Sequence, residues 1–262
     1  MTVVVAGALA GTLALIGHAL KWLTRGGTMA AAGVGTAVLA GAGLRGASLL
    51  ALFFISGSLL TRFSPTLDPA ARDRAVGTRR NAYQVIANGT WAAVGGLLLW
   101  IPSLLVGVNG WPLLTGSLAA AQGDTWATET GAFSAKPPRL FTTGKAVAPG
   151  TSGGTTLLGT IGGLTGVATM AGLAILVAVP DRAVAGCVLG GVSGVLIDSL
   201  LGATVQASYY CSSCEESCET ALHRCGLESE QVRGWSRFNN DAVNFVATGV
   251  GGLISVGYWL LR

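Results

Sequence analysis

The sequence predicts an all-α integral membrane protein, built as a polytopic bundle of about seven to eight transmembrane helices. Hydrophobic residues make up 51% of the 262-residue chain and charged residues only 11%, with a mean hydropathy of +0.60. Ordinary soluble domains contain about 25% charged residues, so this chain has too few to cover a water-exposed surface. The charges are also clustered, which leaves apolar stretches near the length of about 20 residues that a bilayer requires. The high apolar content excludes a disordered chain.

Eight apolar blocks account for the predicted crossings, and together they form one integral membrane domain over residues 1–262. The blocks are 2–20, 28–44, 46–61, 83–101, 112–124, 153–179, 183–205 and 241–261. The second and third are short and are separated only by Arg45 and its neighbours, and the fifth is shorter than a full span. Several blocks are rich in Gly and Ala, which lets helices approach closely in lipid.

The distribution of charge predicts the orientation. Most charges lie at 62–81, 126–149 and 206–241. The first block has no basic residue before it, so we expect an anchor with its N-terminus outside rather than a removable signal peptide. Eight crossings then place the charged stretches on one side, which the positive-inside rule makes cytoplasmic. The net charge of +4 therefore indicates orientation and anionic ligands, and no nucleic acid is expected as a partner. The oligomeric state stays open between a monomer and a homodimer.

Two aspartates stand at the edges of apolar blocks. Asp124 lies in Gly-Asp-Thr-Trp, and Asp198 lies in Leu-Ile-Asp-Ser. A carboxylate at membrane depth is costly and usually faces a cavity, a cation or a substrate. The simpler alternative is a single Asp hydrogen-bonded to Ser or Thr of a neighbouring helix. Together with Glu129, the two aspartates would suit Mg²⁺, which takes a few carboxylate oxygens beside water and substrate phosphates.

A basic stretch with a small-residue turn follows the first aspartate. It contains Lys136, Arg139 and Lys145 before the turn that opens the block at 153. The turn residues are Gly150, Thr151, Ser152, Gly153 and Gly154. Backbone N–H groups at a helix N-terminus form an anion site, so we expect phosphate binding here. A phosphate site beside a metal site is what phosphoryl or nucleotidyl transfer requires.

Further polar residues begin two of the apolar blocks. Arg79 and Arg80 precede the fourth block and serve as a topology signal, a lipid headgroup contact or a phosphate clamp. Gln84 and Asn88 share a helix face one turn later, for helix packing or for substrate. The last block repeats this theme with Asn240, Asp241 and Asn244.

Four of the five cysteines lie in the loop at 206–240, as a Cys-x-x-Cys pair, then Cys218, then the cysteine of a His-x-Cys pair. In a cytoplasmic loop disulfides are disfavoured, so this spacing predicts a structural Zn²⁺ site. The candidate ligands are Cys211, Cys214, Cys218, His223 and Cys225. The first two form the firm half, and the other three compete for the remaining positions. The alternative is a reduced, metal-free loop. Cys187 lies alone in an apolar block as a small core residue.

Taken together, "GDTWATETG", "PPRLFTTGKAVAPGTSGGTT", "LIDSLLGATVQA" and "NNDAVNF" resemble the membrane family that includes chloroplast phytyl-phosphate kinase and eukaryotic transmembrane protein 19. The resemblance covers about residues 50–260, and the cysteine loop resembles that of bacterial members. The family is more distantly similar to dolichol kinase and phosphatidate cytidylyltransferase, which use CTP and Mg²⁺.

The resemblance implies transfer of a phosphoryl group from CTP or another nucleoside triphosphate to an isoprenoid (phytyl or prenyl) phosphate in the membrane. On this hypothesis Asp124 and Asp198 hold Mg²⁺, Lys145 joins them in catalysis, and Arg79 and Arg80 clamp the acceptor phosphate. Two alternatives remain. A cytidylyltransferase that makes a CDP-lipid would use the same groups, and a transporter would use the aspartates as cation sites.

Overall fold

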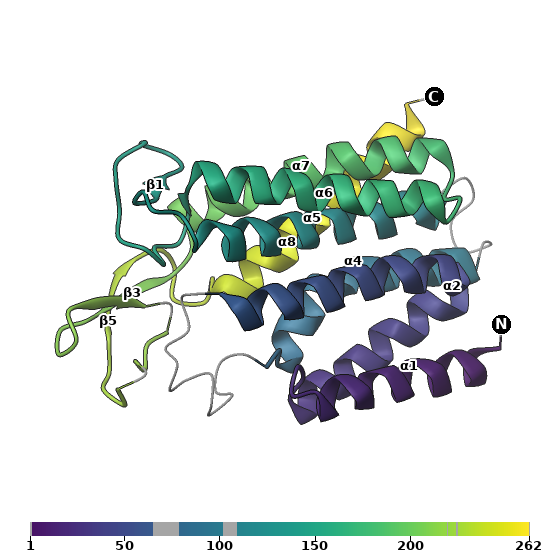
Figure 1. Cartoon of the computed structure of the whole chain (residues 1–262), viewed down its shortest axis with the longest axis horizontal. Coiled ribbons are helices and arrows are strands. Elements are labelled where there is room, and N and C mark those ends of the chain that lie inside the picture. The colour runs from purple at the N-terminus through teal and green to yellow at the C-terminus, as the bar shows by residue number, and fades with distance from the viewer. Residues whose placement is uncertain (1, 65–78, 102–108, 219, 224, 262) are drawn as a thin grey trace.

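The computed structural model describes residues 2–64, 79–101, 109–218, 220–223 and 225–261. Residues 65–78 of the charged stretch at 62–81, and residues 102–108, lie outside the described residues. The described residues form a bundle of seven helices (Figure 1). The helices are α1 (Val3–Ala19), α2 (Arg25–Phe63), α4 (Ala82–Trp100), α5 (Gly110–Gly131), α6 (Leu157–Leu176), α7 (Asp181–Thr204) and α8 (Asn240–Leu260).

The predicted helical membrane class is confirmed, whereas the number of crossings stays a prediction. Among the described helices α2, α6, α7 and α8 are long and apolar enough to cross a membrane, and α1 is a shorter apolar helix. The 39 residues of α2 would extend about 58 Å at 1.5 Å per residue if they were straight, which is nearly twice a hydrocarbon core. It bends at Gly43, whose φ of 59° is a left-handed conformation that favours glycine. The bend falls at the boundary expected between the blocks 28–44 and 46–61.

Five short strands lie outside the bundle, at one end of it (Figure 1). They are β1 (Arg139–Leu140), β2 (Gly154–Thr155), β3 (Ser208–Cys211), β4 (Glu216–Cys218) and β5 (Glu230–Arg233). The first two form an antiparallel pair, and the others form an antiparallel sheet in the order β4-β3-β5. The sequence prediction of an all-α fold missed these strands, because each has only two to four residues and lies within a polar loop.

The described parts of the charged stretches at 126–149 and 206–241 share one end of the bundle, opposite both termini (Figure 1). At this end the backbone N–H of Thr24 donates to the carbonyl of Arg80 at 3.1 Å, which joins the α1–α2 connection to the start of α4. At the other end Arg45 donates to the carbonyl of Ala178 at 3.1 Å, which joins the bend of α2 to the α6–α7 connection. This grouping is the one that eight crossings predict, while the membrane side that each end faces stays a prediction.

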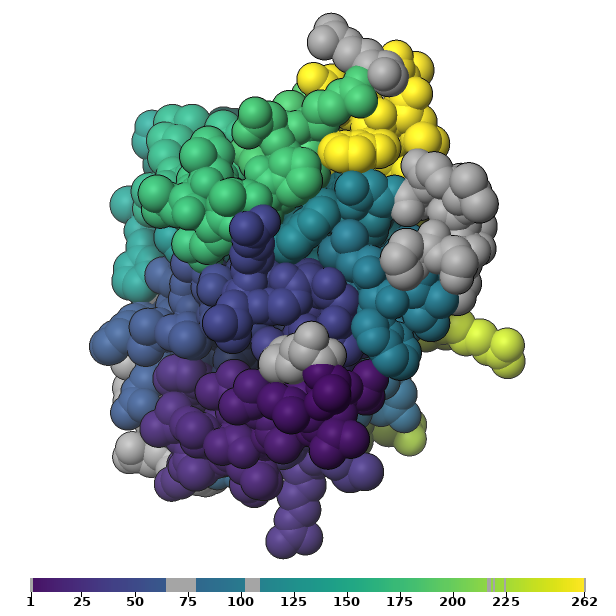
Figure 2. Space-filling model, turned by 90° about the vertical axis from the view of Figure 1, so that its right-hand side faces the viewer, coloured from purple at the N-terminus to yellow at the C-terminus, as the bar shows by residue number. Residues whose placement is uncertain are grey.

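The centre of the bundle is α5, which packs against α2, α4, α6, α7 and α8. Nearly all of its residues from Gly110 to Gly123 are buried. Viewed from the end that carries the N-terminus, α1 forms one edge of the bundle, and the C-terminal helices form the opposite edge (Figure 2). The polar half of α5 therefore emerges from the middle of the bundle at the charged end.

Candidate active site

The helices α5 and α7 lie side by side and run in the same direction. A Cβ atom on Gly191 would lie 2.8 Å from Cβ of Ala119, and a Cβ on Gly194 would collide with that of Ala120. Residues four apart share a helix face, one turn along. Because Asp124 follows Ala120 by four residues and Asp198 follows Gly194 by four, the two aspartates lie level with each other on facing sides of α5 and α7. Both are half-buried.

The helix α8 runs antiparallel to α7 and contributes Asn244 at the same level. A Cβ on Gly194 would lie 3.1 Å from the carbonyl oxygen of Ala247. Asn244, three residues before Ala247, lies about one turn nearer the charged end and is 9% exposed. Asn240 and Asp241 are half-buried in the first turn of α8, which Asn239 caps. The predicted polar start of α8 thus lies at the same end of the bundle as the aspartates.

Glu129 lies on a different side of α5 from Asp124. Five residues along a helix turn a side chain by about 140°. The hydroxyl of Thr61 on α2 donates to the Oε1 atom of Glu129 at 2.5 Å. Thr125, one turn before Glu129, also faces α2, because a Cβ on Gly57 would lie 3.2 Å from its Cγ2 atom. This orientation therefore does not favour the expected site in which Glu129 and both aspartates bind the same Mg²⁺ ion.

Arg80 fills the space between α2 and α5, just before α4 begins. A Cβ on Gly57 would collide with Nη2 of Arg80, and the guanidinium carbon lies 4.8 Å from the centre of the Phe53 ring and 5.7 Å from that of Phe54. Burial lowers the pKa of Arg80 to about 10, and the Glu129 carboxylate opposes that shift. The side chain consequently remains a cation at neutral pH, held by aromatic faces and one carboxylate.

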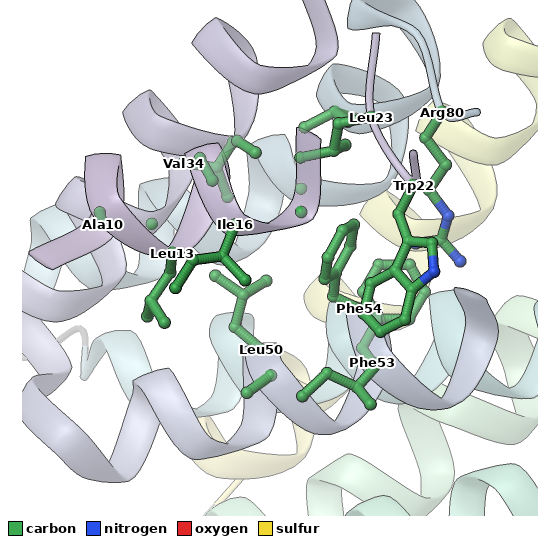
Figure 3. Close-up of a pocket in the computed structure, with 18 of the residues that line it drawn as sticks. Ala10, Leu13, Ile16, Trp22, Leu23, Val34, Leu50, Phe53, Phe54 and Arg80 are labelled. Atoms are coloured by element: carbon green, nitrogen blue, oxygen red, sulfur yellow. The ribbon is translucent and has the colours of Figure 1, made fainter. Parts of the chain in front are cut away.

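An apolar cavity of about 310 Å³ lies between α1, α4 and the two arms of α2, which are the helical segments before and after Gly43. Its walls include Leu13, Ile16, Leu50 and Phe54, and Arg80 stands at one end of it beside Trp22 (Figure 3). Cavities of about 300–1,000 Å³ with mostly apolar walls and a few polar groups are typical of small-molecule sites. No sequence motif indicates this cavity, because its walls come from four helical segments and include α1, which carries none of the recognised motifs.

Two predicted polar residues of α4 also line this cavity, and both already bond within their own helix. Gln84 Oε1 accepts the backbone N–H of Asn81 at 3.0 Å, and Asn81 Oδ1 accepts that of Gln84 at 3.0 Å, which closes a capping box. Asn88 donates to the carbonyl of Gln84 at 3.0 Å. Arg79 is half-buried, and its Nε atom has no hydrogen bond within the described part of the chain.

The small-residue turn at 150–154 packs on the end of α7 instead of opening α6. A Cβ on Gly153, whose φ is +74°, would collide with the backbone of Ala203, and one on Gly202 would lie 2.8 Å from the nitrogen of Gly153. The prediction that the turn starts a helix at 153 is wrong: α6 begins at Leu157, and the Thr156 side chain caps it. Gly202 follows Asp198 by four residues, so the turn lies about one helical turn beyond this aspartate.

Two predicted phosphate-binding cations are exposed on the loop before this turn. Arg139 donates through Nη1 to the carbonyl of Gly144 at 2.8 Å, so its guanidinium holds the loop itself. Lys145 is exposed, and its backbone carbonyl accepts the N–H of Leu140 at 2.9 Å. The cation that holds the small-residue turn is instead Arg233, which donates through Nη2 to the carbonyls of Ser152 at 2.8 Å and Gly202 at 2.9 Å. A single Arg among polar residues gave no signal of this contact.

Comparison with known proteins agrees with this membrane architecture. Residues 8–252 match the family described as integral membrane protein DUF92. The chain belongs to this family. It is similar to Protein PGR of Arabidopsis thaliana, with 30% identity over 235 residues that cover 79% of this chain and 78% of the relative. It is also 32% identical over 246 residues to the uncharacterized membrane protein MJ0933 of Methanocaldococcus jannaschii, covering 93% of this chain and 89% of that one. No solved structure matches significantly.

The resemblance that the four motifs predict is thus confirmed for this DUF92 protein at the level of the family. The comparison extends the match toward the N-terminus, because it begins at residue 8 and not near residue 50. The family match therefore includes most of α1 and the first arm of α2, which are two of the four helical segments that line the cavity.

The packing of the turn on α7 gives a first prediction for the DUF92 protein. Gly153→Ala should lower the free energy of unfolding by about 2–4 kcal/mol, because the methyl group meets the Ala203 backbone and φ is positive. Gly150→Ala is the matched control in the same turn: its φ is +81° and a Cβ there meets nothing within 4 Å. It should cost only about 1 kcal/mol. Thermal unfolding in detergent measures both, and equal losses would contradict the contact with α7.

Proposed function

We propose that this protein is an isoprenoid-monophosphate kinase that transfers the γ-phosphoryl group of CTP, or of another nucleoside triphosphate, to a prenyl phosphate dissolved in the membrane. The observation that carries the proposal is the position of Arg80. Its side chain closes one end of the apolar cavity and lies near the Glu129 carboxylate of α5, the helix that also carries Asp124. A ligand with an apolar chain and an anionic headgroup matches this arrangement.

The acceptor half of the site follows from the cavity. An isoprenoid tail has no hydrogen-bonding groups, so it fits walls made of Leu, Ile, Val and Phe side chains. Its phosphate would meet the Arg80 guanidinium, which is planar and suited to bidentate contacts with phosphate. Arg79 adds a second cation with an unused N–H, within the described residues. A bound phosphate would then share the charge of the Arg80 guanidinium with the Glu129 carboxylate.

The donor half of the site consists of Asp124, Asp198 and the turn at 150–154. Two half-buried carboxylates on facing helix sides fit Mg²⁺, which favours carboxylate oxygens together with substrate phosphates. When bound, this ion would neutralise charge on the transferring phosphoryl group. The turn exposes Gly150 and leaves Thr151 partly exposed, one helical turn beyond Asp198. Lys145 is exposed on the same loop, where its ammonium group is accessible to a nucleotide. We therefore assign it contact with the nucleotide phosphates as its part in catalysis.

The reaction then needs alignment more than proton transfer. An oxygen of the acceptor phosphate, already an anion, attacks the γ-phosphorus of CTP, and the bond from that phosphorus to the β,γ-bridging oxygen breaks. The products are prenyl diphosphate and CDP, and no general base is required. Holding both phosphates in line and neutralising their repulsion supplies the catalysis.

The test uses the purified full-length protein in nanodiscs with geranylgeranyl phosphate and CTP labelled at either the α- or the γ-phosphorus. With γ-labelled CTP, a kinase transfers the label to the lipid and releases unlabelled CDP. With α-labelled CTP, the label stays in the released CDP. Transfer of the α-label with release of pyrophosphate would replace the kinase by a cytidylyltransferase. No label in the lipid with CTP, ATP, GTP or UTP would overturn both.

A further inference from the structure

The lobe formed by β3, β4 and β5 has almost no apolar core. Among the residues of 208–233 whose side chains the structure describes, those that are buried are Ser208, Cys211 and His223. The larger apolar side chains of this lobe, including Leu222, Leu227 and Val232, are exposed. A small lobe that buries so little apolar surface needs another source of stability, such as a bound metal ion.

The ligand atoms of such a site are already gathered. One atom from each of four side chains lies within 4.8 Å of all the others. The four residues are Cys211, Cys214, His223 and Cys225. The two sulfur atoms of Cys211 and Cys225 are 3.8 Å apart, and Nδ1 of His223 is 3.1 Å from the sulfur of Cys225. Tetrahedral Zn²⁺ with Zn–S bonds of about 2.3 Å separates two sulfurs by about 3.8 Å.

Both pairs of ligands come from tight turns that hold them in this position. Glu215, directly after Cys214, has a φ of +55°, and Gly226, directly after Cys225, has a φ of +87°. The Gly226 N–H donates to the carbonyl of His223 at 2.9 Å. Cys218, the remaining cysteine of the loop, is bonded elsewhere, to the Thr220 carbonyl at 3.4 Å and the Ser229 hydroxyl at 3.3 Å. The geometry therefore favours the other four candidate ligands and excludes Cys218 from the cluster.

We propose that this four-residue cluster binds one structural Zn²⁺ ion, and that the ion holds the small-residue turn of the donor site through Arg233. Binding replaces the thiol protons of the three cysteines, which pass to solvent, and leaves a neutral His ligand. All four positions are then filled by protein, so the ion has no open position for substrate.

The connection to the donor site runs along β5. Its last residue, Arg233, donates to the carbonyls of Ser152 and Gly202, so one guanidinium joins the lobe, the turn and the end of α7. Loss of the ion should release β5 from β3, and with it the guanidinium that holds Ser152. The turn at 150–154 would then exchange its amide hydrogens faster. This outcome does not depend on whether the protein is a kinase.

Elemental analysis of the purified full-length protein tests the ligand set. We expect one zinc per chain in the unsubstituted protein and in Cys218→Ser, and less than about a tenth of that in Cys214→Ser and Cys225→Ser. Cobalt exchanged into the unsubstituted protein gives a second measurement that does not require a folded variant, because tetrahedral thiolate ligation has its own absorption bands. Zinc loss in Cys218→Ser with retention in Cys225→Ser, a Cys211–Cys225 disulfide, or absence of metal binding would overturn the proposal.

Hydrogen exchange tests the coupling. Removing zinc with a chelator should raise amide exchange in residues 148–156 at least about tenfold. Arg233→Gln should raise it similarly while keeping one zinc per chain. The matched control is Arg237→Gln, since Arg237 is exposed near the same strand. Unchanged exchange in 148–156 after zinc removal would show that the ion does not hold the turn.

Discussion

Replacing Asp124 or Asp198 by Asn should lower kcat for prenyl phosphate phosphorylation by at least about 1,000-fold. Such a change corresponds to about 4 kcal/mol of transition-state stabilisation, the size expected when a carboxylate that neutralises transferring phosphates through a metal is lost. Asn has nearly the shape of Asp, so the helices should stay packed where Ala120 meets Gly194. The measurement is transfer of the γ-label of CTP, with Mg²⁺ varied. A raised Mg²⁺ requirement should accompany the loss.

The matched control for these variants is Asp181→Asn. Asp181 is an exposed carboxylate in the first turn of α7, the helix that carries Asp198, but at the opposite end of the bundle. Its substitution should leave kcat within about twofold, because surface substitutions rarely disturb stability or a distant site. Activity of Asp124→Asn within tenfold of the unsubstituted protein would remove the metal role of this residue.

Much of the fold was predictable because single blocks of sequence determine it. Charge-free stretches predicted the helices, and a break near Arg45 marked the bend that Gly43 makes in α2. The two aspartates were recognisable as candidate site residues because a carboxylate at membrane depth costs free energy. The two aspartates lie at the same height because small residues let α5 and α7 pack closely at Ala120 and Gly194. The sequence of either helix alone does not predict which of their turns meet.

The rest depended on contacts between distant segments. Glu129 looked like a third metal ligand because it is five residues from Asp124, but helical rotation turns it toward Thr61 on α2. The turn at 150–154 looked like a helix start, yet the helix begins at Leu157 and the turn packs on α7. The apolar cavity and Arg233 had no local pattern at all. Periodicity and motif spacing report which residues share an element, whereas these features depend on which elements meet.

Arg80→Gln should raise KM for geranylgeranyl phosphate about 100-fold and leave KM for CTP within about threefold. A charge-assisted contact with phosphate contributes about 1.5–3 kcal/mol, or about 10- to 150-fold. Removing the cation also leaves Glu129 beside the incoming phosphate, and two like charges repel. Arg80→Lys should restore part of the affinity, because it keeps the charge without the planar fork. Arg62→Gln, an exposed arginine at the same end of α2, is the control.

A second variant separates the cavity from the cation. Ala51 lines the cavity, so Ala51→Phe should fill part of it and raise KM for the C20 prenyl phosphate, while a C5 prenyl phosphate with little tail to bury should be unaffected. Ala8→Phe, on the exposed face of α1 and outside the cavity lining, should change neither substrate. Because Arg80 binds the headgroup of both substrates, its loss should weaken both. Equal effects of Ala51→Phe on the C5 and C20 substrates would mean that the tail lies outside this cavity, even if the transfer reaction itself is observed.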